Sequence, residues 1–264
     1  MMTETAKSPL ISIITVVRNA KSTIGYTVQS LLDQDYTNYE YIVIDGASSD
    51  GTLAVLNEYS HSCSFLISEV DKGVYDALNK GLALSKGCMV GVLHAGDTLL
   101  PSALRHVAEL YESARRADFI IAGSSIIKNP NGERLAKRSM LPPLTGKSQA
   151  IHHPALFISR SLFLKYGSYD TSFKISADCE LIARFLTKAT PEVLYTDQPI
   201  VRMASFGVSA DWKNLLDKTS DHVRVLSRHS GSVYTLRYLG ERVVRYSFTA
   251  VRLLLKNRRG ANGY

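Results

Sequence analysis

Residues 10–19 read LISIITVVRN, and this stretch decides the fold class. Apart from Ser12, its first eight residues are apolar or β-branched, and its last two are polar. A short apolar run of this kind is typical of a strand that is buried on both faces of a parallel sheet. The sequence therefore predicts a central strand over Leu10–Val17 whose carboxyl end, at Arg18 and Asn19, opens onto a site.

The same alternation of apolar runs and helical spacing continues along the chain. Further strands are predicted at Tyr39–Ile44, Ser64–Ser68, Cys88–Leu93, Asp118–Ala122 and Ala155–Ser159. Helices are predicted over residues 20–33, 52–59, 74–86, 99–115, 161–166 and 177–187. Strands and helices that alternate at this spacing form an α/β fold with a mostly parallel, doubly wound sheet. Ligands of such sheets bind beyond the carboxyl ends of the strands.

The composition is that of an ordinary folded protein of 264 residues, 45% of them hydrophobic, enough for one large domain with an appendage. Its three cysteines, Cys63, Cys88 and Cys179, are widely spaced, which argues against a disulfide framework or a zinc site and favours a reducing compartment. The amino terminus does not resemble a secretory signal, and no apolar run is long enough to span a bilayer. We therefore expect a cytoplasmic protein.

The net charge of +7 is confined to the carboxyl-terminal fifth of the chain. Residues 212–264 hold 11 Lys and Arg against 3 Asp and Glu, whereas residues 1–211 hold 20 against 21. This contrast predicts a main domain over residues 1–211 and a helical, basic carboxyl-terminal extension over residues 212–264.

The extension has two interpretations. When residues 233–259 are wound as a helix, six cations fall within an arc of roughly 140°, opposite to apolar side chains. These cations are Arg237, Arg242, Arg245, Arg252, Lys256 and Arg259. Such a helix could lie on an anionic membrane surface, the inner face of the cell membrane, or it could pack on the main domain with a solvated basic face. A nucleic-acid partner is not expected, because no base-reading or stacking-aromatic motif accompanies the charge.

Three aspartates are candidates for chemistry. Asp45 begins the stretch DGASSDGT after the second strand, and Asp97 ends the stretch HAGD after the fourth. Because both follow carboxyl ends of strands, they should converge in space. A carboxylate there can hold Mg²⁺ or Mn²⁺ on a diphosphate or accept hydrogen bonds from a nucleoside, or it can cap the next helix. Asp178, in the first turn of a predicted helix, is favoured there by the helix dipole whether or not it does chemistry.

Six segments occur in series: ISIITVVRNA, YIVIDGASSDGT, SEVDKGVYDALNKGLALSKG, VGVLHAGD, HHPALFISRSLFLKYGSYD and SADCELIARF. In order and spacing they resemble family 2 of the inverting GT-A glycosyltransferases, over about residues 8–210, and most closely its bacterial branch that builds capsule, O-antigen or exopolysaccharide units. The resemblance implies a GT-A (Rossmann-like), nucleotide-sugar-binding fold, with residues 1–211 as the catalytic domain. It also implies transfer of a sugar, with inversion, from a nucleotide-diphosphate sugar.

The resemblance further implies roles for particular residues. Those that bind the nucleotide sugar would be Thr15, Val17, Arg18, Asn19, Asp45, Gly46, Asp71, Lys72, His94, Ala95, Gly96 and Asp97. Asp97 would also hold Mn²⁺ or Mg²⁺, without a second carboxylate, because His94 and Gly96 stand where the family often has acidic residues. Asp178 matches the general base that takes the proton of the acceptor hydroxyl. Residues 202–209 resemble a flexible loop that closes near the acceptor.

The acceptor implied by the resemblance is a saccharide or a polyprenyl-diphosphate-linked sugar at the membrane. Two other hypotheses stay open. One is a catalytically silent, glycosyltransferase-like scaffold that binds a nucleotide sugar, which Gly96 favours. The other is a nucleotidyltransferase, which normally has a Gly-rich, basic loop near the amino terminus, where this chain offers only Arg18 and Lys21.

Overall fold

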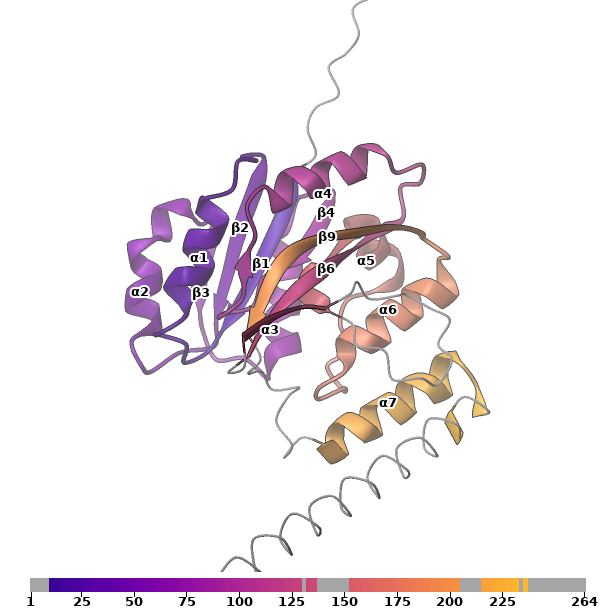
Figure 1. Cartoon of the computed structure of the whole chain (residues 1–264). Helices are drawn as coiled ribbons and strands as arrows, with labels where there is room; N and C mark the ends of the chain where they lie inside the picture. Colours follow the sequence, from indigo (N-terminus) through magenta and orange to yellow (C-terminus); the bar gives the residue numbers. More distant parts are fainter. Residues whose placement is uncertain (1–9, 130–131, 137–151, 205–214, 233–234, 237–264) are drawn as a thin grey trace, which may run out of the picture.

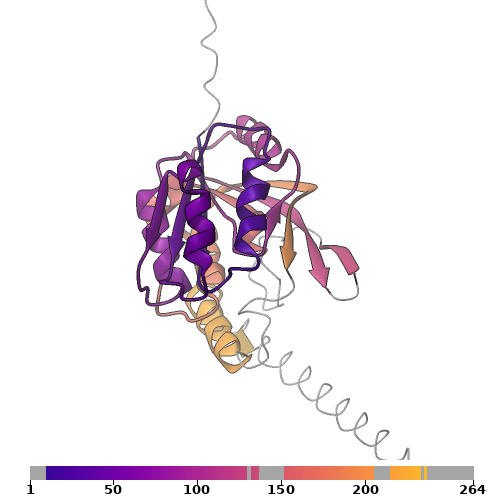
Figure 2. The same cartoon turned by 90° about the vertical axis from the view of Figure 1, so that its left-hand side faces the viewer.

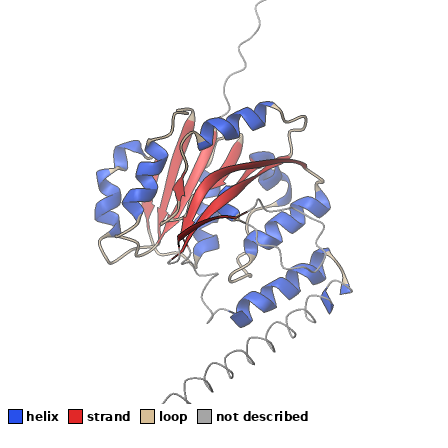
Figure 3. Cartoon of the chain, viewed as in Figure 1, coloured by secondary structure: helices blue, strands red, loops and turns tan. Residues whose placement is uncertain are grey.

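The computed structural model describes residues 10–129, 132–136, 152–204, 215–232 and 235–236, and its centre is a twisted β-sheet (Figure 1). Within these residues the sheet has nine strands, in the order β3-β2-β1-β4-β8-β6-β9-β5, with β7 paired to β6. Helices cover both faces of the sheet (Figure 3), as the alternation of strands and helices predicts.

Parallel strands form the first half of the sheet. They are β1 (Ile11–Val17), β2 (Tyr39–Asp45), β3 (Phe65–Ser68) and β4 (Met89–Val92), and each end lies within one residue of its predicted place. β1 is buried along its whole length and pairs with β2 on one side and β4 on the other. Val17 lies opposite Asp45 in this register, so the carboxyl ends of β1 and β2 meet at one edge.

The second half of the sheet mixes parallel and antiparallel pairs. β8 (Leu156–Ser159) is antiparallel to both β4 and β6 (Phe119–Asn129), and β6 is parallel to β9 (Glu192–Ala204). β5 (Thr98–Leu99) pairs with β9 in the antiparallel direction. β7 (Gly132–Ala136) forms a hairpin with β6 that stands out from the body of the molecule (Figure 2).

Four of these strands differ from the prediction. β6 continues to Asn129, beyond the predicted end at Ala122, and β7 lies where no strand is predicted. β9 has no counterpart among the predicted strands. Its last residues, Arg202–Ala204, are the first three residues of the segment 202–209, for which the sequence predicts a flexible loop. The rest of that segment, residues 205–209, lies outside the described residues. β5 includes Leu99, where the sequence predicts a helix. α4 (Ala103–Glu112) begins only after Pro101, because the residue before a proline is biased away from the helical region.

The helices form two layers, one on each face of the sheet (Figure 1). α1, α2 and α4 bury their apolar side chains against one face, and α3, α5 and α6 bury theirs against the other. Their bounds are Ile24–Leu32 for α1, Thr52–Glu58 for α2, Val74–Leu84 for α3, Arg160–Tyr166 for α5 and Ala177–Lys188 for α6. In β1, Ile13 and Val17 face the first layer and Ile14 and Val16 the second, as the period of two in a strand requires.

α7 (Leu215–His229) packs against α6, and its Val225 joins the same buried cluster as Phe173 (Figure 1). The division of the chain at residue 211 stays a prediction. The basic helix predicted over residues 233–259 falls, apart from residues 235 and 236, outside the described part of the chain. In the described part, no helix is both long enough and apolar enough to cross a membrane.

Candidate active site

The carboxyl ends of β1, β2 and β4 meet at one edge of the sheet, and most of the predicted site residues lie there. The N–H of Gly46 donates to Val17 O over 2.9 Å, and the N–H of Leu93 donates to Ile14 O over 3.0 Å. These main-chain bonds bring Asp45, at the end of β2, and the HAGD turn after β4 beside the end of β1, where an α/β sheet binds its ligands.

Asn19 ties the loop after β1 to the loop after β2. Its N–H donates to Ser48 Oγ over 2.8 Å, and its Oδ1 accepts from the N–H of Ser49 at 2.9 Å. Asn19 has a left-handed φ of 52°, a conformation that asparagine tolerates better than most residues. The residue therefore shapes this edge of the site by joining its two loops.

Arg18, Gly46 and Asp71 form one wall of the site. A Cβ on Gly46 would collide with Asp71 Oδ2 and would lie 3.5 Å from Arg18 Cδ, so both side chains lie directly against the main chain of Gly46. Asp71 Oδ1 accepts a hydrogen bond from the N–H of Gly73 at 2.8 Å, which fixes the turn through Lys72. Arg18 and Lys72 are exposed and supply positive charge that an anionic ligand can use.

Thr15 and Asp45 have no exposed surface. The Thr15 hydroxyl donates to Leu93 O over 2.7 Å. The Asp45 carboxylate accepts from the hydroxyl and the N–H of Ser48, the latter at 3.1 Å, and from the hydroxyl of Ser68 at 2.6 Å. In this conformation both side chains hold the framework of the site. Because Asp45 has no exposed surface, it could contact a nucleoside base only after a neighbouring group moved away.

The HAGD turn places Asp97 beside the end of β9. Gly96 has a left-handed φ of 97° and donates its N–H to Thr27 Oγ1 over 2.9 Å. Asp97 is only 6% exposed, and its Oδ1 accepts from the N–H of Ala204 at 2.9 Å. Burial raises the pKa of Asp97 to about 7, and no Lys or Arg among the described residues pairs with the carboxylate to oppose that rise.

The surroundings of Asp97 fit a divalent metal ion that is shared with a ligand. A buried carboxylate without a counter-charge favours a bound cation, and Mg²⁺ commonly uses one or two protein carboxylates together with substrate phosphates. Ala95 packs on the apolar core and offers no ligand. Across the part of the chain that the structure describes, no group of three or more His, Cys, Asp and Glu could hold a metal unaided.

Asp178 lies in the first turn of α6 and is half-buried. Its Oδ1 is 3.4 Å from the hydroxyl of Tyr75. Burial raises the pKa of Asp178, and the hydrogen bond that its carboxylate accepts from the N–H of Cys179 opposes the rise. A carboxylate with a raised pKa is a stronger base, which suits a group that takes a proton from a hydroxyl.

A cluster of four rings connects Asp178 with the HAGD turn, and the sequence prediction includes only one of them, His94. Tyr169 stacks on Tyr75 with ring centroids 5.8 Å apart, and its hydroxyl bonds to His153 Nε2 at 2.8 Å. The rings of His153 and His94 lie 5.8 Å apart. Burial lowers the pKa of both histidines to about 4, so both are neutral at pH 7. Three of these rings stand in the segments DKGVYDALNKG and HHPALFISRSLFLKYGSYD, where attention to polar aromatic residues would have found them.

The family model for glycosyl transferase family 2 matches residues 12–171. The chain belongs to glycosyl transferase family 2. This glycosyltransferase is similar to an uncharacterized glycosyltransferase of Mycobacterium tuberculosis, 32% identical over 186 residues that cover 67% of this chain and 69% of that protein. It is also similar to a PGL/p-HBAD biosynthesis glycosyltransferase of Mycobacterium bovis, 27% identical over 204 residues that cover 76% of this chain and 78% of that protein.

Solved structures share the fold of this glycosyltransferase. The crystal structure of S. aureus TarS 1–349 superposes with a TM-score of 0.65 at 16% identity, covering 87% of this chain and 70% of that chain. Mannosyltransferase PcManGT from Pyrobaculum calidifontis, in complex with GDP-Man and Mn²⁺, superposes with a TM-score of 0.63 at 17% identity, covering 84% of this chain and 64% of that chain. The predicted α/β, GT-A fold is confirmed.

Proposed function

We propose that this glycosyltransferase moves a sugar from a nucleotide-diphosphate sugar to a hydroxyl group of a saccharide, with inversion, in a single displacement. One observation carries the proposal. Asp97, in the HAGD turn, and Asp178, at the start of α6, are buried or half-buried carboxylates of raised pKa. The four-ring cluster connects the HAGD turn with the start of α6. A carboxylate suited to a cation and a carboxylate suited to a proton are the two groups that such a displacement needs.

The donor would bind at the wall formed by Arg18, Gly46 and Asp71 and extend towards Asp97. Two structures with this fold support a nucleotide sugar as donor: PcManGT with GDP-Man and Mn²⁺, and S. aureus TarS 1–349 with UDP-GlcNAc, at a TM-score of 0.65 and 14% identity. When held by Asp97, Mn²⁺ or Mg²⁺ would stabilise the charge that grows on the departing diphosphate. The exposed cations of Arg18 and Lys72 would bind further negative charge of the donor.

On the acceptor side, Asp178 would take the proton of the attacking hydroxyl while the oxygen of that hydroxyl forms the new bond to the anomeric carbon. The bond from that carbon to the diphosphate breaks, and the diphosphate leaves with the electron pair. The family model ends at residue 171, so the role of Asp178 is supported by its position and by the resemblance of SADCELIARF. Because the acceptor is an ordinary sugar hydroxyl, positioning by the protein should provide much of the acceleration.

A panel of UDP-, GDP- and dTDP-sugars with Mn²⁺, followed by thermal unfolding, tests the proposal. We expect one donor class to stabilise the protein by about 2.7 kcal/mol at a hundred times its dissociation constant, and EDTA to remove most of that gain. No stabilisation by any member of the panel would contradict the proposal. Stabilisation without any metal-dependent donor hydrolysis or transfer would instead favour a catalytically silent scaffold.

We further propose a place in the branch that builds bacterial surface polysaccharides, with a saccharide or a polyprenyl-diphosphate-linked sugar as acceptor. The resemblance of the six segments supports it. The relative from M. bovis, named for PGL/p-HBAD biosynthesis, makes acceptors of that pathway the first alternative to test.

A lipid-linked acceptor would place the enzyme on the inner face of the cell membrane, and we propose that the basic extension holds it there. In α7 two of the cations are engaged within the protein, since Arg228 lies 2.9 Å from Asp170 and the Arg224 guanidinium lies 4.1 Å from the Phe173 ring. We therefore expect the cations that reach a membrane to be those from residue 237 onward, six of which fall on one face of the predicted helix.

Co-sedimentation with liposomes tests the membrane proposal. The full chain should sediment with anionic vesicles and not with neutral ones, and raised salt should release it. Replacing Arg242, Arg245 and Arg252 by Gln in the full chain should weaken binding by about 3 kcal/mol, since each cation near an anionic surface contributes about 1 kcal/mol. Equal sedimentation of the two proteins, or no preference for anionic lipid, would show that the extension does not hold the enzyme on the membrane.

A further inference from the structure

The two residues that precede α6 have their main chain buried and held from outside the helix. Ile175 is 8% exposed and Ser176 2% exposed, and Ser176 is the N-cap of α6 but makes no side-chain cap hydrogen bond. N–H groups at the start of a helix have no partner within the helix, and a buried one must find a partner elsewhere. Asp178 follows two residues after Ser176, so whatever holds Ser176 also sets the direction in which Asp178 points.

Asp221 of α7 supplies those partners. One oxygen of its carboxylate, Oδ2, accepts from the N–H of Ile175 at 2.8 Å and from the N–H of Ser176 at 3.2 Å. The whole residue is only 4% exposed. A carboxylate that accepts main-chain N–H bonds makes stronger hydrogen bonds than a neutral group does. Asp221 therefore holds the main chain at the entry to α6 from a neighbouring helix.

Tyr75 of α3 holds Ile175 from the other side. Its hydroxyl donates to Ile175 O over 2.5 Å and lies 3.4 Å from Asp178 Oδ1. Tyr75 is itself fixed, because Tyr169 stacks on its ring and Asn79 bonds to both the N–H and the carbonyl of Tyr169 at 2.9 Å. The N–H of Ile175 is thus bound by α7, and its carbonyl is bound by α3.

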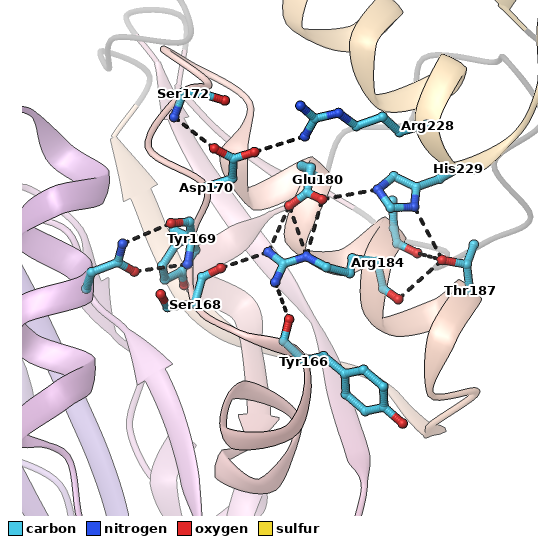
Figure 4. A network of polar contacts seen from close by, with 12 residues as sticks. Tyr166, Ser168, Tyr169, Asp170, Ser172, Glu180, Arg184, Thr187, Arg228 and His229 are labelled. Carbon is cyan, nitrogen blue, oxygen red and sulfur yellow. Dashed lines mark hydrogen bonds and ion pairs between the residues drawn. The ribbon is translucent and has the colours of Figure 1, made fainter.

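Polar contacts hold α7 against α6 and against the turn before it (Figure 4). His229 Nε2 lies 3.1 Å from Glu180 Oε1, and Arg184 lies 2.8 Å from the same carboxylate. Arg228 lies 2.9 Å from Asp170, a contact that Figure 4 shows beside the first pair. Glu180 and His229 are almost fully buried, with side chains 5% and 8% exposed. These contacts fix α7, and with it Asp221, relative to the start of α6.

We infer that Asp221 and Tyr75 are positioning residues for Asp178: they grip Ile175 from α7 and from α3 and so set the orientation of the carboxylate that takes the acceptor proton. The inference rests on the proposed role of Asp178. It makes α7 a part of the catalytic apparatus, although α7 lies beyond the segment that the family model matches. A displacement of about 1 Å at a reacting group is enough to lower a rate about a hundredfold. Loss of the hydrogen bond from Asp221 or from Tyr75 to Ile175 would permit such a displacement of Asp178.

The test measures release of UDP from UDP-GlcNAc or of GDP from GDP-Man, whichever gives the larger thermal shift, with water as the acceptor. Asp221→Ala and Tyr75→Phe should each lower kcat by roughly tenfold to a hundredfold while donor KM stays within about twofold. Asp221→Asn should recover much of the loss, because its amide oxygen can still accept from Ile175. The control is Asp217→Asn on the same helix, where Asp217 is half-exposed and pairs with Lys174 at 3.2 Å; kcat should not change.

A second arm separates positioning from a general loss of structure. In an Asp178→Asn background there is no base left to orient, so Asp221→Ala and Tyr75→Phe should lower the residual rate no further. An equal loss in both backgrounds, or a loss shared by kcat and donor binding, would overturn the inference. An unchanged kcat in folded Asp221→Ala or Tyr75→Phe would overturn it as well. If Asp221→Ala does not fold, Tyr75→Phe decides the matter by the same comparison. Full turnover in Asp178→Asn alone would instead refute the proposed base, and the inference would fall with it.

Discussion

Asp178→Asn should remove most sugar transfer and leave donor binding unchanged. Asparagine keeps the shape of the side chain in the first turn of α6 but cannot take a proton, and loss of a general base lowers rates by about 10²–10⁴-fold. The half-buried position of Asp178 and its raised pKa make it a stronger base than an exposed aspartate would be. The measurement is kcat for nucleotide release, with donor affinity determined on the same samples.

The matched control for this substitution is Asp118→Asn, at the opposite edge of the sheet, where Asp118 pairs with Lys165 at 2.9 Å. That variant should keep its turnover. Turnover of Asp178→Asn within a few-fold of the parent would exclude Asp178 as the base. A loss of stability without a selective loss of kcat would mean that the carboxylate serves mainly the dipole of α6, an effect of about 0.3–1 kcal/mol at exposed helix ends.

The parallel half of the sheet could be predicted from the sequence because its central strands, β1, β2 and β4, are buried on both faces and are therefore largely apolar runs. β9 could not. It contains Asp197, Gln198 and Pro199, and its pairing with β6 shifts register between Ala122 and Ser125, so neither alternation nor a continuous apolar run marks it. β5 is two residues long and forms only because β9 lies beside it.

The site could be predicted as a set of carboxylates at strand ends but not as a set of contacts. The order of strands brings Gly46, Asp71 and Asp97 to one edge, and that much follows from an α/β pattern. Nothing in the sequence shows that Ser48 and Ser68 occupy the carboxylate of Asp45. Such contacts join residues far apart in sequence, and they depend on side-chain packing that local patterns do not encode.

The contacts of Ile175 illustrate the limit most clearly. The residue is held by Tyr75, a hundred positions earlier, and by Asp221, 46 positions later. The sequence prediction assigns α7 to the basic extension, because the excess of Lys and Arg begins at residue 212. The packing of α7 on the main domain has no comparable signal in the sequence. Val225 and Asp221 of α7 are nevertheless buried against the residues around α6.

Asp97→Asn should abolish metal-dependent donor binding without unfolding the protein. The amide oxygen of asparagine can still accept the hydrogen bond from Ala204, which Asp97 Oδ1 accepts at 2.9 Å, but the negative charge that a divalent cation requires is lost. Changing a group that only supports a metal ligand lowers affinity about 10–100-fold, so loss of a ligand should cost at least as much. Donor titrations with Mn²⁺ and with EDTA measure the effect, and Asp118→Asn is again the control. Unchanged metal dependence in Asp97→Asn would refute the assignment.

The pKa of about 7 at Asp97 gives the same assignment a second, independent signature. Below pH 7 the carboxyl holds a proton that a metal must displace, so metal-dependent donor affinity should fall about tenfold between pH 8 and pH 6. His94, with a pKa of about 4, and the diphosphate diester of the donor do not titrate in this range. In the absence of metal, the free energy of unfolding should change with pH in the opposite direction to donor affinity. The pKa of Asp97 is higher in the folded than in the unfolded protein, so stability should decrease by about 1 kcal/mol as pH rises from 6 to 8. Asp97→Asn should lose both dependences, and Asp118→Asn should keep both. Equal pH profiles for the two variants would show that the carboxyl titrating near pH 7 is not Asp97.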